Sequence, residues 1–370
     1  MKKLIQLFLV LVGAVNLVGS CNTNGNSPTI NYEGFIKPIE NPIVRADSNY
    51  TFLCPMKNKL VRWQKADVFN PAAIVKDGKV MLLYRCEDNP AAHLGGRTSR
   101  IGLAESADGI RFRKFPTPVL YPGKDDFSQY DAPGGCEDPR VVVTEGGMYV
   151  MTYTSWNYET PRLSIAFSRD LITWEKKGPA FEKAYEGKFK NIASKSGSIL
   201  TKRAGNNFVA AKVNGRYWMY WGELGVNLAW SENLYDWFPE LNEHGGLHYL
   251  IEPRKGKFDS NLTECGPPAL ITEEGVVLIY NGKNSDSEEN ATRDFPRGTY
   301  SVGRVVFNSQ DLRMVVDRSE KPFLYPTLPH EVQGQYKAGT TFAEGLVFFK
   351  GKWFLYYGTA DSFVGLTVAK

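Results

Sequence analysis

The sequence predicts an all-β protein built as a five-bladed β-propeller, and two observations support this fold class. First, a unit of short runs rich in β-branched and aromatic residues, bounded by Gly, Asp, Asn and Pro, recurs five times, about every 60–75 residues. Second, no long stretch has the periodicity of an amphipathic helix. Repeated antiparallel units of three or four strands are typical of propellers, whose radial packing protects the sheet edges. A β-sandwich, the second interpretation, would show shorter and more even spacing.

Each unit is centred on an aromatic strand that a glycine opens. These strands are expected at residues 78–85, 147–153, 215–220, 275–280 and 351–357. A short apolar run precedes each of them, at 71–75, 140–143, 198–200, 269–271 and 346–349. A run of small and apolar residues follows each of them, at 101–109, 164–171, 227–234, 300–307 and 364–369. We therefore expect one propeller domain over residues 56–370.

The N-terminus resembles an export signal. A short basic region precedes a mostly apolar stretch, 4–18, which is too short and too interrupted for a comfortable membrane span. The stretch ends in Gly19-Ser20-Cys21, which resembles the lipobox of bacterial lipoproteins, in which the Cys becomes the lipidated N-terminus. We expect a lipoprotein signal peptide at 1–20, a polar tether and lead segment at 21–55, and a membrane anchor on Cys21. The alternative is an ordinary signal peptide with an incidental Cys.

Composition and charge exclude several classes of function. The net charge of +4 comes from Lys and Arg scattered among Asp and Glu, so the chain shows no electrostatic footprint for nucleic acid.

Four further cysteines stand at wide spacing, and the sequence leaves their disulfide state open: Cys54, Cys86, Cys136 and Cys265. There is no CxxC pair and no His at metal-ligand spacing, so we expect neither a metal site nor a cofactor.

The propeller interpretation also predicts where the site lies. Residues that lead into the first strand of each blade, and residues that end the second strand, converge at the mouth of the central channel. The leading segments are 69–71, 135–140, 194–197, 263–268 and 340–344, and the strand ends are 85–88, 154–157, 222–223, 281–282 and 360–361. Asp, Glu, Arg, Lys, Asn and Trp dominate both sets, which suits a sugar-binding funnel. Ordinary turn chemistry is the competing explanation for any one of these residues.

At these positions the sequence resembles glycoside hydrolase family 130, the mannoside phosphorylases and mannosidases. The shared motifs, one per blade and in the family's order, are Asn70-Pro71-Ala72, Gly135-Cys136-Glu137-Asp138-Pro139-Arg140, Gly266-Pro267-Pro268 and Tyr356-Tyr357-Gly358-Thr359-Ala360-Asp361. The resemblance covers almost all of the mature chain. It implies a five-bladed propeller, inversion at the anomeric carbon, and a manno-oligosaccharide or mannan-derived glycan as substrate.

The resemblance also implies roles for individual residues. Asp138 is the expected general acid, which passes its proton through a hydroxyl of the bound sugar. The residues expected to contact the sugar are Asn70, Arg85, Lys195 and Asp361, and we add Glu137 and Arg140, which flank Asp138.

The sequence departs from the family where its phosphorylases bind phosphate with cations. Phe69, Glu223 and Glu264 occupy those positions here. Carboxylates repel a phosphate dianion and can instead activate water, so the sequence predicts hydrolysis. Glu223 and Glu264 are both candidates for the base.

The favoured hypothesis is an exported, lipid-anchored, inverting β-mannosidase at the periplasm or the cell surface, acting on β-1,2 linkages. A β-mannoside phosphorylase and a non-catalytic glycan-binding lipoprotein are the alternatives.

Overall fold

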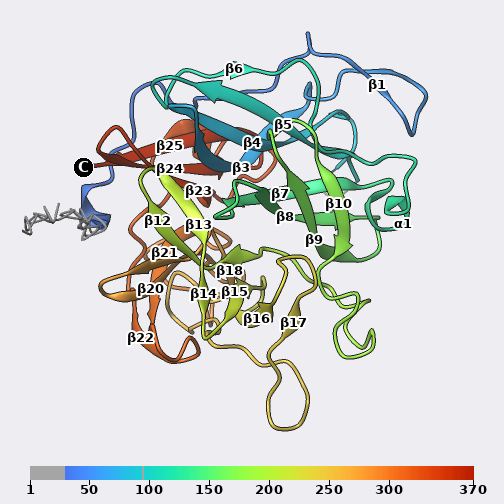
Figure 1. Cartoon of the computed structure of the whole chain (residues 1–370). Coiled ribbons are helices and arrows are strands. Elements are labelled where there is room, and N and C mark those ends of the chain that lie inside the picture. The colour runs from blue at the N-terminus through green and yellow to red at the C-terminus, as the bar shows by residue number, and fades with distance from the viewer. Residues whose placement is uncertain (1–29, 94–95) are drawn as a thin grey trace, which may run out of the picture.

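The computed structural model describes residues 30–93 and 96–370, and strands dominate it (Figure 1). The described helices are short: η1 (Tyr32–Gly34), α1 (Ser128–Asp131) and η2 (Pro329–Glu331). The all-β prediction is therefore confirmed. Within the described part of the chain, no helix is long and apolar enough to cross a membrane. The predicted signal peptide at 1–20 and the predicted lipidation site at Cys21 lie outside the described residues.

The antiparallel strands form successive units along the chain. The first unit contains β3 (Asp67–Lys76), β4 (Lys79–Glu87), β5 (Ser99–Ser106) and β6 (Arg113–Lys114). The second contains β7 (Gly135–Val143), β8 (Tyr149–Trp156), β9 (Pro161–Ser168) and β10 (Glu175–Pro179). In both units, each of the two middle strands pairs with a strand on either side, as the repeat in the sequence predicts.

The third unit carries an insertion that the sequence interpretation missed. Its strands are β11 (Ser198–Ile199), β15 (Arg216–Trp221), β16 (Asn227–Ser231) and β17 (Phe238–Pro239), and the inserted strands are β12 (Thr201–Ala204), β13 (Asn207–Ala210) and β14 (Lys212–Val213). The β12–β13 hairpin reaches both neighbouring units: Val209 pairs in parallel with Val143 of β7, and Thr201 pairs in parallel with Leu270.

The last two units complete the order. The fourth contains β18 (Leu262–Cys265), β19 (Leu270–Thr272), β20 (Gly275–Lys283), β21 (Tyr300–Phe307) and β22 (Val315–Arg318). The fifth contains β23 (Phe342–Phe349), β24 (Lys352–Thr359) and β25 (Phe363–Ala369). In Figure 1 the units follow one another around a common centre, from blue at the top through green and yellow to red. This arrangement is consistent with a β-propeller.

The N-terminal lead segment packs against the last unit. Ile36 forms a bridge with Val368, and Val44 forms one with Val364, so this segment runs antiparallel beside β25. The hairpin of β1 (Phe52–Cys54) and β2 (Lys59–Val61) spans the predicted domain start at residue 56. One apolar core contains side chains of the first unit, the lead segment and the fifth unit together. The beginning and the end of the described chain are therefore held together by packing.

A recurring turn explains part of the repeat that the sequence shows. After the third strand of the second unit, the Ser168 hydroxyl accepts the backbone N–H groups of Asp170 and Leu171, and Leu171 has a positive φ of 71°. The indole of Trp174 then donates to the Leu171 carbonyl at 3.0 Å. The third unit repeats the same turn with Ser231, Asn233, Leu234 and Trp237. These hydrogen bonds require the hydroxyl and the indole N–H at this spacing.

A single arginine connects three units. The Arg140 side chain, on β7, is 1% exposed and donates to the carbonyls of Cys265 at 2.8 Å and Gly266 at 3.1 Å, next to β18. Its guanidinium also lies 3.0 Å from a carboxylate oxygen of Glu344, on β23. Burial raises the pKa of Glu344 well above its ordinary value, against the charge of Arg140. Because the Arg140 charge is itself buried, removing the groups that accept from it would leave that charge unpaired.

Candidate active site

A cavity of about 330 Å³ lies where the inner strands of the units end. The predicted site residues that line it are Asn70, Arg85, Glu137, Asp138, Lys195, Glu223, Glu264 and Asp361. They come from all five units, which are far apart in sequence. The structure therefore brings together every predicted substrate or catalytic residue except Arg140.

Backbone irregularities in the inner strands aim two of these side chains into the pocket. The ladder between β3 and β4 shifts register at Asn70, and the ladder between β7 and β8 shifts at Asp138. Both residues are left-handed, with φ of 47° and 48°, a conformation that Asn and Asp tolerate better than most residues. Each is followed by a proline, which has no N–H to donate to a ladder. The Asn-Pro and Asp-Pro pairs in the sequence are thus bulge signals.

Glu223 is placed by a tight turn at the end of β15. The preceding Gly222 has a φ of 127°, and a Cβ there would lie 2.2 Å from the Gly225 carbonyl oxygen. Only glycine fits this backbone. The turn at Gly222 therefore sets the position from which the Glu223 side chain extends.

Asp138 is buried and surrounded by donors. Its Oδ1 accepts from the Asn70 amide at 2.9 Å and from the Arg85 guanidinium at 3.2 Å. Burial alone would raise the pKa of Asp138, but the charges of Arg85 and Lys195 outweigh it and hold the pKa at about 2. In the free pocket this carboxyl is therefore ionised.

Arg85 connects Asp138 to a second acid, Glu137. Its Nη2 lies 2.8 Å from Oε1 of Glu137, which also accepts from the Ser99 hydroxyl at 3.0 Å. Burial raises the pKa of Glu137 to about 7, against the lowering effect of Arg85. Since Asp138 is ionised, its negative charge also helps to raise the pKa of Glu137, which keeps its proton up to about pH 7.

Lys195 stands between three carboxylates. Its Nζ lies 3.6 Å from Oε1 of Glu264, 3.7 Å from Oε1 of Glu223 and 3.9 Å from Oδ2 of Asp138. Burial lowers the pKa of Lys195, but the carboxylates of Glu264 and Glu223 raise it well above its ordinary value. The lysine is a fixed positive charge, and the acids around it lie within about 8 Å of one another.

The two glutamates differ in environment. Glu264, on β18, is 2% exposed, and its Oε1 accepts from the Ser196 hydroxyl. Burial raises the pKa of Glu264 to about 7, opposed by the charge of Lys195. The Glu223 side chain is 42% exposed. Glu264 is thus the better oriented of the two, with a pKa near neutrality, which suits a general base.

Replacing Glu264 by glutamine is expected to stabilise the protein more at pH 8 than at pH 5. The folded-state pKa of about 7 lies above the ordinary 4.5, so the folded protein holds this proton where the unfolded chain releases it. The contribution of Glu264 to stability is complete below pH 4.5 and is lost as the pH rises through 7. Glutamine resembles the protonated acid at every pH. Urea denaturation should show a gain in unfolding free energy that is about 2 to 3 kcal/mol larger at pH 8.

The matched control for this titration is Glu232→Gln, at an exposed position. It should show no such pH dependence, and an equal effect of Glu264→Gln at both pH values would contradict the prediction.

Arg140 differs from its predicted placement. It does not appear in the lining of the cavity but lies beneath it, where it donates to the carbonyl of Asp138 at 2.9 Å. Side chains alternate across a strand, and the bulge at Asp138 changes which face each following residue occupies. Asp361 does line the cavity, and burial raises its pKa to about 6.

Several aromatic side chains complete the cavity. Tyr300 and Tyr336 line it and were not selected from the sequence, and Trp156 and Phe342 lie in the predicted segments without having been selected. Tyr300 is the first residue of an expected strand, so the sequence could have placed it at the site. Tyr336 belongs to a long connection without strand periodicity, so the sequence contains no such signal for it. Aromatic faces beside carboxylates suit a pyranose ring. Among the described residues, no group of three or more His, Cys, Asp and Glu could hold a metal ion.

Known proteins resemble this chain along almost all of its described length. The family model of glycoside hydrolase family 130, described as beta-1,4-mannooligosaccharide phosphorylase, matches residues 37–370. A solved structure of a glycosyl hydrolase from Bacteroides ovatus is 47% identical, with a TM-score of 0.88, over 90% of this chain and 93% of that chain.

Two further similarities describe different reactions. One solved structure is 49% identical, with a TM-score of 0.88, over 90% of this chain and 93% of that chain. It is described by the statement that the GH130 family of mannoside phosphorylases contains glycoside hydrolases that target β-1,2 mannosidic linkages in Candida mannan. A curated relative, 1,2-beta-oligomannan phosphorylase from Thermoanaerobacter sp. (strain X514), is 28% identical over 83% of this chain and 90% of its own length.

Proposed function

The chain belongs to glycoside hydrolase family 130, and we propose that it is an inverting β-mannosidase that hydrolyses β-1,2-linked manno-oligosaccharides on a five-bladed β-propeller. The similarity to a structure described with β-1,2-specific glycoside hydrolases supports the linkage. The lipobox-like sequence before Cys21 supports an exported, membrane-anchored form of this enzyme.

The charge of the pocket lining is the observation that favours hydrolysis over phosphorolysis. Five carboxyl groups line the cavity, and only Arg85 and Lys195 oppose them among the lining residues. Both cations are already engaged with carboxylates. Phe69, where a phosphorylase has a cation, is 1% exposed and packs its ring against the Arg85 guanidinium, 4.8 Å away. A phosphate dianion would meet repulsion here, whereas a neutral water would not.

The proposed reaction uses the acids on opposite sides of the scissile bond. A water oxygen forms a bond to the anomeric carbon while the bond from that carbon to the leaving oxygen breaks. Glu264 takes the proton that the water loses, and Glu223 orients the water. The leaving oxygen receives a proton from the Asp138 side, through a hydroxyl of the bound sugar. Lys195 keeps these carboxylates in place without adding a proton.

The acid side of the reaction needs a proton on Asp138, which is ionised in the free pocket. A bound sugar removes water from around Asp138, which favours its neutral form. Glu137, which contacts the same Arg85 guanidinium, still holds a proton up to about pH 7. In this proposal Glu137 gives its proton to Asp138 as the sugar binds, and Asp138 then delivers that proton toward the leaving oxygen.

Hydrolysis of β-1,2-mannotriose without phosphate tests this proposal. We expect mannose to be released at a rate that added phosphate changes by less than about twofold, since the pocket repels the anion. Product followed by NMR should first appear as the α-anomer, because inversion of a β-mannoside produces it.

Phosphate-dependent release of mannose 1-phosphate would show a phosphorylase instead. Tight binding without any turnover would show a glycan-binding protein.

A further inference from the structure

An apolar groove of about 520 Å³ lies where the N-terminal lead segment packs beside the fifth unit. Apolar side chains from four elements line it, namely Ile36 of the lead segment, Ile110 after β5, Phe354 of β24 and Val368 of β25. Ile36 is 73% exposed, and Ile39, three residues further along the same segment, is 96% exposed. We call the surface formed by this groove and Ile39 the lead-segment face. Contiguous exposed apolar surface of this kind marks an interaction site, which scattered single residues do not.

Positive charges lie at the edge of the lead-segment face. Among the residues that the structure describes, the only charged ones that line the groove are Lys352 and Lys370, and both are exposed. Arg111, which follows Ile110, lies 3.8 Å from Glu40 and so links the turn after β5 to the lead segment. An apolar surface with lysines at its edge suits the headgroup layer of a membrane, where apolar side chains enter among the lipids and lysines meet lipid phosphates.

The length of chain before the described residues limits how far this face can lie from a membrane. Ile30, the first described residue, is nine residues after Cys21, the expected lipidation site. Nine residues span at most about 30 Å even when they are fully extended. Ile36 and Ile39 follow Ile30 on the same segment, so a lipid on Cys21 would hold this end of the molecule near the bilayer.

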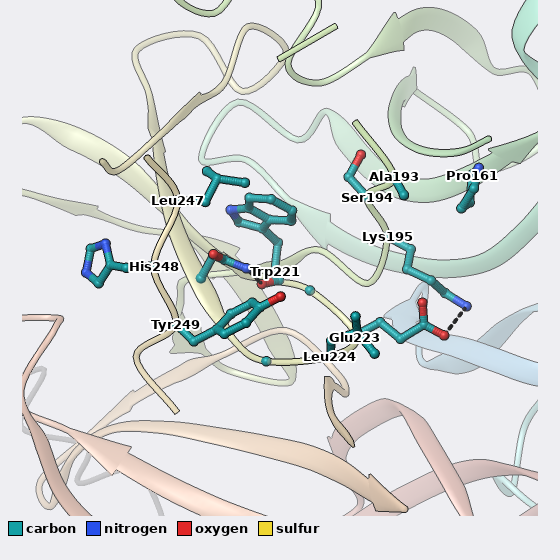
Figure 2. Close-up of a pocket in the computed structure, with 13 residues that line it drawn as sticks. Pro161, Ala193, Ser194, Lys195, Trp221, Glu223, Leu224, Leu247, His248 and Tyr249 are labelled. Atoms are coloured by element: carbon teal, nitrogen blue, oxygen red, sulfur yellow. Dashed lines mark hydrogen bonds and ion pairs between the residues drawn. The ribbon is translucent and has the colours of Figure 1, made fainter. Parts of the chain in front are cut away.

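The catalytic cavity lies at the opposite ends of the strands. β24 begins at Lys352, in the groove, and ends at Thr359, two residues before Asp361 of the catalytic cavity. A strand of this length spans about 25 Å. Lys195 and Glu223, whose charged ends approach each other in Figure 2, belong to the same catalytic cavity. A surface that covers the lead-segment face therefore leaves the catalytic cavity uncovered.

We propose that the lead-segment face lies on the membrane that carries the lipid anchor, with Ile36 and Ile39 inserted among the lipids and Lys352 next to lipid phosphates. This inference rests on the lipid-anchored form proposed above. The anchor and the face act as two linked contacts, which fix the orientation of the enzyme as a single flexible tether would not. The catalytic cavity then opens away from the bilayer, where a glycan can enter it.

Fluorescence quenching by lipids measures this orientation in the lipidated protein. Lys370→Cys and Glu159→Cys each provide an exposed thiol for a fluorophore, because the four described cysteines are buried. Lys370 lines the groove, whereas Glu159 lies just after β8, whose last residue, Trp156, lines the catalytic cavity. In vesicles of phosphatidylethanolamine and phosphatidylglycerol that contain a nitroxide-labelled lipid, we expect quenching at position 370 to be at least about threefold stronger than at position 159.

The two exposed isoleucines are then replaced in the protein labelled at position 370. Ile36→Ser with Ile39→Ser should reduce the quenching there to about the level at position 159, because the apolar contact with lipid is lost. Leu53→Ser with Leu60→Ser is the matched control, since these leucines are 62% and 69% exposed and lie opposite each other on the β1–β2 hairpin. This control should leave the quenching unchanged. An unchanged melting temperature in detergent checks that both variants fold.

Equal quenching at positions 370 and 159, or quenching that survives the loss of both isoleucines, would overturn the inference. A label at position 370 that becomes shielded in detergent as the protein concentration rises would show that a second copy of the chain covers the face, which also overturns it. Mass spectrometry of Cys21 and the mannotriose assay test the proposed function separately. An unmodified Cys21 would overturn the anchored form and this inference with it, whereas absent hydrolysis would overturn the reaction and not the orientation.

Discussion

Asp138→Asn is expected to lower kcat for β-1,2-mannotriose by about 10²- to 10⁴-fold, the usual contribution of a general acid. Asparagine preserves the shape of the side chain and can still accept the hydrogen bond from Asn70 through Oδ1. It cannot transfer a proton to the leaving oxygen. Because the loss is in the transition state, KM should change little.

A substrate with an activated leaving group provides the control for Asp138→Asn. A β-mannoside of a low-pKa phenol needs little protonation to depart, so its hydrolysis should fall much less than that of mannotriose. Equal losses on both substrates, or a changed melting temperature, would indicate misfolding or misplacement. Unchanged activity on mannotriose would remove Asp138 from the mechanism.

Glu264→Gln is expected to be the second most damaging change, with kcat about 10²- to 10⁴-fold lower because the base is lost. Glu264 is buried, its Oε1 accepts from Ser196, and burial raises its pKa to about 7. Glu223→Gln should cost only about tenfold, since its amide can still orient a water. The side-by-side measurement of kcat in these two variants checks the assignment.

The reverse order of these losses would make Glu223 the base. The pH profile gives an independent check, because the rising limb of kcat/KM near pH 7 should disappear in whichever variant lacks the base.

The repeat in the sequence predicted most of the strands because each unit contains the same β-branched and aromatic runs, bounded by Gly, Asp, Asn and Pro. The inserted β12–β13 hairpin was not predicted, although its Gly205-Asn206 turn lies between two β-like runs. Its strands pair with each other and also, in parallel, with strands of the two neighbouring units. Such pairing is decided by tertiary packing, which a repeat search does not contain.

The candidate site was predictable because equivalent strand ends from the different units converge at one cavity, independently of the length of the loops between them. Asp138 and Asn70 could be chosen because they stand in motifs that resemble those of glycoside hydrolase family 130, just before the first strand of a unit. The structure adds that each lies at a bulge in its strand. Arg140 could not be placed, since the same bulge decides whether the next side chains face the pocket or the interior. Tyr336 could not be placed either, because it reaches the pocket from a long connection.

The contacts of Arg140 have a consequence for how the protein loses its structure. In a linear repeat array each unit meets only its neighbours, so the ends can melt while the middle remains. Here one guanidinium is bonded to backbone next to β18 and to a carboxylate on β23, while its own strand carries Asp138. If one of these units unfolded alone, the Arg140 charge would stay in the interior without its partners, which is energetically costly. Unfolding of the units one after another is therefore unfavourable. The enzyme should therefore denature in one cooperative transition, and truncation of the last unit should abolish folding of the others as well as catalysis.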